Sequence, residues 1–148
     1  THCESSAASD VYKRQPYLIG IHISEGTNLP SGEKISAIRD IIDDQLLGIM
    51  LSCVSPENFE INLKELKNLN VPFGFKVNAF VTTKPKDGYT STFTKSNGNP
   101  NEFLGQREDL TPQKVGELAR NFHNNGATII GGCCETRPSH IEAMVNTI

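Results

Sequence analysis

The feature that most constrains the fold is a repeated alternation of short apolar runs with segments of helical character. Residues 17–23, YLIGIHI, form the first run, and comparable runs occupy 46–52, 72–81 and 127–132. The first run is short, β-branched and without polar alternation, which is typical of a strand buried on both faces of a sheet. We therefore predict an α/β fold with parallel strands whose carboxyl ends share one edge.

Helical signals follow each apolar run. Ile35, Ile38 and Ile42 recur at a spacing that places them on one face of a helix. The other helices are predicted from their first residues, either Ser or Thr before Pro or the capping-box spacing of Ser and Glu. These pairs are Ser55-Pro56, Thr111-Pro112 and Ser139-Glu142.

Composition excludes several classes of protein. The 148 residues are 36% hydrophobic and 21% charged, with a formal charge of -3, which fits one globular core. The 14 Lys and Arg residues form no basic run, so we expect no nucleic-acid partner. No apolar stretch approaches the roughly 18 residues of a membrane span. We expect a cytoplasmic protein without a membrane partner.

The chain divides into a tail and a domain. Residues 1–15 are small and polar without helical or strand period, and we interpret them as a disordered or extraneous tail rather than an interaction segment. Cys3 lies in this tail and is left out of the chemistry. The domain is 16–148, and its long Gly-, Pro- and Asn-rich stretch, up to about residue 110, is predicted to be a functional or mobile loop.

Three cysteines follow the ends of predicted strands. Cys53 comes after the second run, and Cys133 and Cys134 come after the fourth. Adjacent cysteines are poor disulfide partners, and nothing in the sequence indicates secretion. Three thiolates at one edge suit Zn²⁺, and three protein ligands leave a coordination position open, as catalytic zinc sites do. The alternative is that each cysteine is a small buried hydrophobe, which is weakest for the adjacent pair.

Two glycines precede the cysteine pair. Gly131 and Gly132 carry no side chains, so a substrate could approach the backbone closely beside the predicted ligands. We expect both glycines to contribute to substrate binding.

At this point two motifs carry a resemblance. IIGGCCETRPSHI, at the carboxyl end of the chain, resembles the zinc motif of the homocysteine S-methyltransferase family, and SCVSPENF is similar to that family's upstream motif with a single zinc cysteine. The resemblance implies a (β/α)8 TIM barrel in which Cys53, Cys133 and Cys134 bind zinc. It also implies methyl transfer to the thiolate of homocysteine, giving methionine, from a small-molecule or cobalamin donor.

Other positions are interpreted through the same resemblance. Asn78 matches a strand-end Asn of the family, which implies a place near the substrate, although an ordinary turn residue is an equal alternative. Ser52 stands where the family usually has Asn, and Glu135 stands where Gly is common. We expect His140 to lie at a helix start rather than to bind zinc, and His22 to be either near the substrate or part of the core.

The length indicates part of a barrel. A full barrel needs roughly 200 to 250 residues, so four strand–helix units correspond to its carboxyl-terminal half, strands five to eight. Two other functions stay open on the residues alone. One is a structural zinc module, and the other is a redox protein that uses the adjacent thiols.

Overall fold

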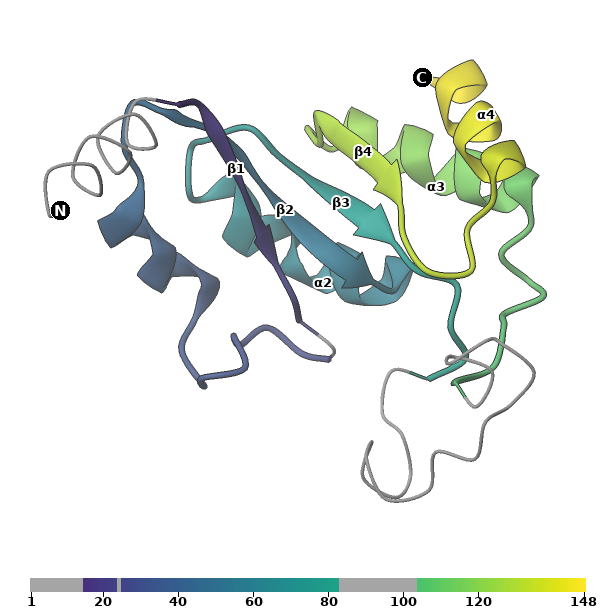
Figure 1. Cartoon of the computed structure of the whole chain (residues 1–148), viewed down its shortest axis with the longest axis horizontal. Coiled ribbons are helices and arrows are strands. Elements are labelled where there is room, and N and C mark those ends of the chain that lie inside the picture. The colour runs from purple at the N-terminus through teal and green to yellow at the C-terminus, as the bar shows by residue number, and fades with distance from the viewer. Residues whose placement is uncertain (1–14, 24, 83–103) are drawn as a thin grey trace, which may run out of the picture.

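The chain forms a single parallel sheet of four strands in its computed structural model, which describes residues 15–23, 25–82 and 104–148 (Figure 1). The strands lie in sequence order, with each strand parallel to its neighbour. They are β1 (Tyr17–Ile21), β2 (Leu46–Val54), β3 (Phe73–Val77) and β4 (Ile129–Gly132). The predicted α/β class with parallel strands is confirmed, and the carboxyl ends of all four strands lie along one edge.

The helices form a second layer behind the sheet (Figure 1). α2 packs on β2 and β3, and α4 packs on β4 and on α3. The helices are η1 (Ile35–Ile41), α2 (Pro56–Lys67), α3 (Pro112–Asn124) and α4 (Pro138–Thr147). No helix in the described part of the chain has the length and apolar composition of a membrane span.

Two predicted helix starts are confirmed by their capping bonds. The Ser55 hydroxyl accepts a hydrogen bond from the Asn58 N–H at 3.2 Å, and Thr111 caps α3 in the same way at 3.2 Å. The predicted Ser139-Glu142 capping box is wrong. The N-cap of α4 is Arg137, whose backbone N–H donates to Nδ1 of His140 at 3.0 Å.

The first predicted helix is a 3₁₀ helix, η1. Ile35 and Ile38 are buried at 0% and 7% exposure, whereas Ile42 is the C-cap residue and lies beyond the last turn. A 3₁₀ helix has three residues per turn, so side chains at i and i+3 lie on the same side of it. Two apolar residues at this spacing are therefore enough to form its buried face. The isoleucine spacing therefore predicted the buried face but not the type of helix.

The core lies between the sheet and the helix layer. Three aromatic rings, one each from α2, β3 and α3, meet with centroid separations of 4.8 to 5.3 Å. They are Phe59, Phe75 and Phe122, all at 2% exposure or less. Tilted and edge-on aromatic contacts of this kind add to the free energy gained from burial alone. This aromatic core fixes α2 and α3 against the central strand β3.

The other face of the sheet is not covered by any described helix. The prediction that the first strand is buried on both faces is wrong, because Leu18 is 45% exposed. The alternation of residues along each strand and the register between strands assign a set of residues to this surface, which we call the open face. Its members are Leu18, Gly20, Gly48, Met50, Ser52, Gly74, Lys76, Ile129 and Gly131.

Two predictions concern residues outside the described part. The tail assigned to 1–15, including Cys3, falls almost wholly on residues 1–14, and most of the long loop falls on residues 83–103. Both stay predictions.

Candidate metal centre

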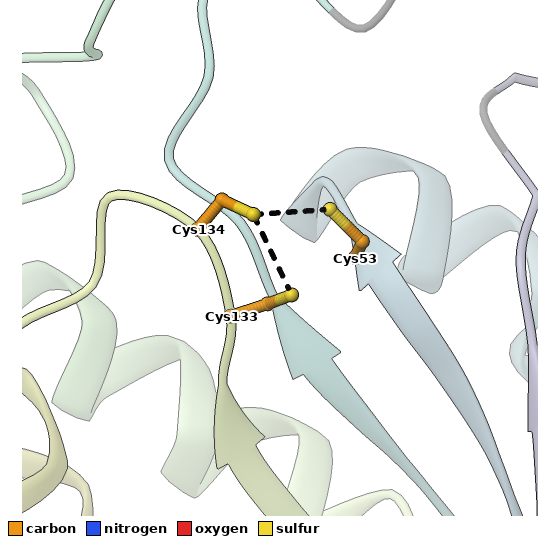
Figure 2. A group of neighbouring side chains, drawn as sticks. All are labelled: Cys53, Cys133 and Cys134. Carbon is orange, nitrogen blue, oxygen red and sulfur yellow. Dashed lines mark hydrogen bonds between the residues drawn. The ribbon is translucent and has the colours of Figure 1, made fainter. Parts of the chain in front are cut away.

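Three cysteine thiols converge at the carboxyl edge of the sheet (Figure 2). The sulfur of Cys134 lies 3.8 Å from that of Cys53 and 3.9 Å from that of Cys133. All three sulfurs lie within 4.8 Å of one another, and all three cysteines are free thiols. The predicted meeting of Cys53 with the adjacent pair is thus present, although β2 and β4 are separated by β3.

The residues that follow β3 tie the two cysteine segments together. On one side, the Asn78 N–H donates to the Val54 carbonyl at 2.9 Å. On the other side, the Cys133 N–H donates to the Val77 carbonyl at 2.7 Å, and the Ala79 N–H donates to the Cys134 carbonyl at 3.0 Å. Because backbone bonds of residues 77–79 reach both sides, the ends of β2 and β4 are held at a fixed separation across β3.

Asn78 also fixes Cys53 through its side chain. Its amide nitrogen donates to the Cys53 carbonyl at 2.6 Å and lies 3.8 Å from the Cys53 sulfur. Its amide oxygen accepts a bond from the Phe80 N–H at 3.2 Å, and the residue is only 1% exposed. Both ends of the amide are therefore used within the chain. A donor that touches a ligand in this way orients it for a metal.

Cys53 lies inside β2 rather than beyond its end, contrary to the prediction. Ser52 pairs with Lys76 and Val54 pairs with Val77, so Cys53 has no partner on β3 and forms a bulge. Its φ of 54° is in the left-handed region, which non-glycine residues seldom adopt. A bulge re-aims a side chain, and here it occurs at the residue whose sulfur reaches Cys134.

The adjacent cysteines are held by a tight turn. The Thr136 hydroxyl donates to the Cys133 carbonyl at 2.5 Å, and the Thr136 N–H donates to the same oxygen at 3.2 Å. Glu135 completes the turn with a φ of 60°. A left-handed residue between the pair and Thr136 bends the chain sharply, so Cys133 and Cys134 can both present their sulfurs to Cys53.

The pKa values of two of the thiols, Cys53 and Cys134, are raised. Burial, followed by the nearby thiols of Cys133 and Cys134, raises the pKa of the Cys53 thiol to about 12. The pKa of the Cys134 thiol is also raised, first by burial and then by Cys133. Neighbouring groups that would carry the same charge resist deprotonation together. A cation among the sulfurs reverses this effect, because a coordinating thiol is deprotonated outright.

The cluster fits a zinc ion in both chemistry and spacing. Tetrahedral zinc with sulfur ligands at about 2.3 Å requires sulfur separations of about 3.8 Å. The Cys134 sulfur lies 3.8 and 3.9 Å from the other two sulfurs, and all three lie within 4.8 Å of one another. Soft thiolate donors are also those that zinc accepts. Within the described residues, the grouping contains these three ligands and no fourth.

His140 is engaged elsewhere, in accord with the predicted place at a helix start. Its Nδ1 accepts the Arg137 N–H at 3.0 Å, and its Nε2 lies 3.0 Å from the Leu110 carbonyl. This pattern requires the proton on Nε2. Nδ1 caps the start of α4, Nε2 joins α4 to the segment before α3, and the residue is 6% exposed.

The two glycines before the pair face different surroundings. A Cβ on Gly132 would lie 2.3 Å from the Thr136 hydroxyl oxygen and 3.0 Å from Ile141, so that space is already filled by the chain. A Cβ on Gly131 would meet only the Lys76 stem at 3.6 Å and the Phe75 carbonyl at 3.8 Å. The open face beside the metal centre thus has room at Gly131, while Gly132 leaves space for its own turn.

Arg107 has partners that the sequence did not indicate. Its guanidinium lies 2.8 Å from Glu57 at the start of α2 and 2.6 Å from Asp109. The guanidinium lowers the pKa of both carboxyl groups. The Arg107 N–H also donates to the Ala79 carbonyl at 2.8 Å. These contacts connect the first turn of α2 with the segment that follows β3. Arg107 and Glu57 are 50 positions apart in the sequence, so no local pattern indicated their contact.

Two histidines have backbone partners. The His22 Nδ1 lies 3.2 Å from the Ser52 carbonyl, next to Cys53, and the His22 side chain is exposed rather than part of the core. The His123 Nδ1 lies 3.1 Å from the Ala127 carbonyl at the end of α3. His22 therefore lies at the same strand edge as the thiols, and His123 does not.

Fold and site together define an α/β protein with a cluster of three thiols that could hold a metal ion at the carboxyl edge of a parallel sheet. The family model of homocysteine S-methyltransferase matches residues 2–148, so the chain belongs to the homocysteine S-methyltransferase family.

Two curated relatives illustrate this membership. The chain is 26% identical over 125 residues to homocysteine S-methyltransferase YbgG of Bacillus subtilis (strain 168), which covers 84% of this chain. It is 25% identical over 122 residues to homocysteine S-methyltransferase 1 of Zea mays, which covers 81% of this chain. In each case the match spans 34% of the relative, so the chain corresponds to about a third of their length.

Proposed function

We propose that this chain provides the zinc centre of an enzyme that transfers a methyl group to homocysteine and forms methionine. The observation that carries the proposal is the convergence of the Cys53, Cys133 and Cys134 sulfurs within 4.8 Å in a member of this family. Three ligands leave one coordination position for the sulfur of a substrate.

Each residue of the centre has a separate task in this proposal. The three cysteines hold the metal, and Asn78 sets the direction of the Cys53 sulfur through its bond to the Cys53 carbonyl. Gly131 leaves the open face accessible next to the cysteines. When bound, zinc would supply Lewis acidity that keeps the substrate thiol ionised at neutral pH.

The reaction itself is a methyl transfer between two substrates. The thiolate sulfur of homocysteine attacks the methyl carbon of the donor, a new carbon–sulfur bond forms, and the donor leaves with the electron pair of its former bond to that carbon. The three cysteines would hold the metal at a fixed place on the sheet edge and so would define where the substrate sulfur is bound, since positioning of the reacting atoms lowers the barrier. The donor is a small molecule with a cationic centre or a methylated cobalamin.

We further propose that the chain forms the carboxyl-terminal half of a (β/α)8 barrel, strands five to eight, in the cytoplasm. The parallel sheet with helices on one face supports this, because in such a barrel helices surround the strands and side chains fill the inside. A chain that matches only 34% of its relatives is also consistent with a partial barrel. Reduced cysteines are the norm in the cytoplasm.

The experiment measures zinc content and sulfur coordination before and after homocysteine is added. We expect one zinc per chain, with X-ray absorption reporting one additional sulfur ligand in the presence of homocysteine. Cys53→Ser should lose zinc, whereas Cys3→Ser, the matched control in the tail, should retain it.

Other outcomes identify the alternatives. An unchanged sulfur count would contradict the proposal and indicate a structural zinc site. Reversible oxidation of Cys133 and Cys134 that does not require Cys53 would indicate a redox protein.

A further inference from the structure

The four strands contain one charged side chain, Lys76 of β3. It belongs to the open face and is half-buried, whereas every other lysine in the described part of the chain is exposed. An ammonium group on an inner strand of a parallel sheet costs free energy of folding unless it is hydrated or paired. Its position therefore points to a function beyond the stability of the sheet.

Lys76 lies directly beside the metal centre. In the register of the sheet it pairs with Ser52, the residue before Cys53, and with Gly131, two residues before Cys133. At about 3.3 Å per residue, Gly131 is only about 7 Å along the strand from Cys133. Gly131 and Cys133 are separated by the two-residue repeat that places strand side chains on one face. By this alternation, continued one residue past the end of β4, Lys76 lies on the same side of the sheet as Cys133.

The stem of Lys76 leans toward the strand that carries the cysteine pair. Its Cγ is 3.6 Å from the position that a Cβ of Gly131 would occupy. A Cβ at Gly131 would make only ordinary van der Waals contact with this stem, so the open face beside β4 has room next to Lys76.

No acidic side chain of the described residues forms an ion pair with Lys76. The comparison with Arg107 is informative, since that guanidinium already binds Glu57 and Asp109. Among the described cations, Lys76 combines a place on the open face with a head group that has no carboxylate partner. An anionic group of a ligand would complete it.

We propose that Lys76 binds the carboxylate of the amino-acid thiol whose sulfur occupies the metal centre, and so determines specificity for that substrate. This inference rests on the proposed function. Homocysteine carries its carboxylate a short carbon chain away from its sulfur, so a substrate held at the cysteines can extend along the open face toward Lys76. A charge-assisted bond to the carboxylate would select amino-acid thiols over simple thiols.

The test compares three thiols on the zinc-loaded chain. L-homocysteine has both charged groups, mercaptobutyrate lacks the amino group, and aminopropanethiol lacks the carboxylate. Calorimetry should show that Lys76→Met weakens the binding of L-homocysteine and of mercaptobutyrate by about tenfold or more. The affinity for aminopropanethiol should be unchanged. Lys76→Arg should retain most of the affinity that Lys76→Met loses. Added salt should weaken the preference for thiols with a carboxylate in the parent chain but not in Lys76→Met.

Controls separate this inference from the proposed function. Lys64→Met removes an exposed lysine of α2 and should change none of the three affinities. Zinc content of Lys76→Met should equal that of the parent chain, which shows that the metal centre is intact. Equal binding of L-homocysteine by Lys76→Met and the parent would overturn the role of Lys76 and leave the proposed function standing. Failure of the zinc-loaded parent to bind any of the thiols would overturn the proposed function, and the role of Lys76 with it.

Discussion

The aromatic core and the metal centre share strand β3 yet are built in different ways. In the core, Phe59, Phe75 and Phe122 pack against one another in tilted and edge-on contacts between regular elements. At the metal centre, Cys53 and Glu135 adopt left-handed backbone conformations. The core is stabilised by burial of apolar surface and by contacts between aromatic rings, whereas at the cysteine cluster the pKa values of the Cys53 and Cys134 thiols are raised. The difference teaches that the core rests on regular elements, whereas the thiol cluster at the edge of the sheet depends on unusual backbone conformations.

We expect the largest effect from competition between protons and zinc for the thiols, because it acts on the metal centre and not on the aromatic core. Burial and neighbouring thiols raise the pKa of Cys53 to about 12 and raise that of Cys134, so these two thiols are protonated at neutral pH when no metal is bound. Zinc must displace these protons, so its apparent affinity should rise with pH, by about tenfold per pH unit for each thiol displaced. Competition with a chelator of known affinity between about pH 6 and about pH 8 measures this. A flat profile would show that the thiols are already ionised.

Phe122→Ala should affect the core alone. Removal of a fully buried ring of the aromatic core should lower the free energy of unfolding by about 3–5 kcal/mol, measured by urea denaturation. Val145→Ala, at a residue 70% exposed on α4, is the control and should change it by less than about 0.5 kcal/mol. If Phe122→Ala also lowered zinc affinity in the folded protein, the two regions would be coupled.

Asn78→Ala should affect the centre more than the core. Loss of the donor to Cys53 should weaken zinc binding by about 10- to 100-fold, as seen when groups that orient ligands are removed. Asn62→Ala is a matched control, because that buried amide also donates to a backbone carbonyl, at Gly26, but contacts no cysteine. A similar loss of zinc affinity in both variants would mean that general destabilisation, rather than orientation of Cys53, is responsible.

Glu135→Gly should have the smallest effect. A left-handed conformation costs a non-glycine residue about 1–2 kcal/mol, and the greater freedom of glycine when unfolded offsets part of that. We expect a gain of at most about 1 kcal/mol in thermal or urea unfolding. Gly126→Ala, at a φ of 99°, should show the opposite sign. Weaker zinc binding in Glu135→Gly would assign the carboxylate a role at the centre.

Sequence patterns predicted the parts of this molecule that depend on local signals. The apolar runs indicated parallel strands, and Ser55 and Thr111 marked helix starts, because the capping bond joins residues three apart. Convergence of the cysteines was predicted because parallel strands end at one edge.

What the sequence could not predict depends on distant partners. The bulge at Cys53 arises from the register of β2 on β3, and the bond from Asn78 to Cys53 spans 25 positions. The uncovered face beside Leu18 was missed because an apolar run does not reveal whether a second layer packs on it. The ion pair of Arg107 with Glu57 was missed for a related reason, since it forms only when α2 is in place beside the segment that contains Arg107.

The position of β3 between the cysteine-bearing strands has a consequence for folding. The sulfurs of Cys53 and Cys134 belong to residues 81 positions apart, and they meet only when β2, β3 and β4 have all paired. Parallel pairing over such separations is slow, because the loop must close before any contact rewards it. The complete thiol cluster is therefore a late product of folding, and a nascent chain that has not finished its sheet offers zinc no more than a pair of adjacent thiols.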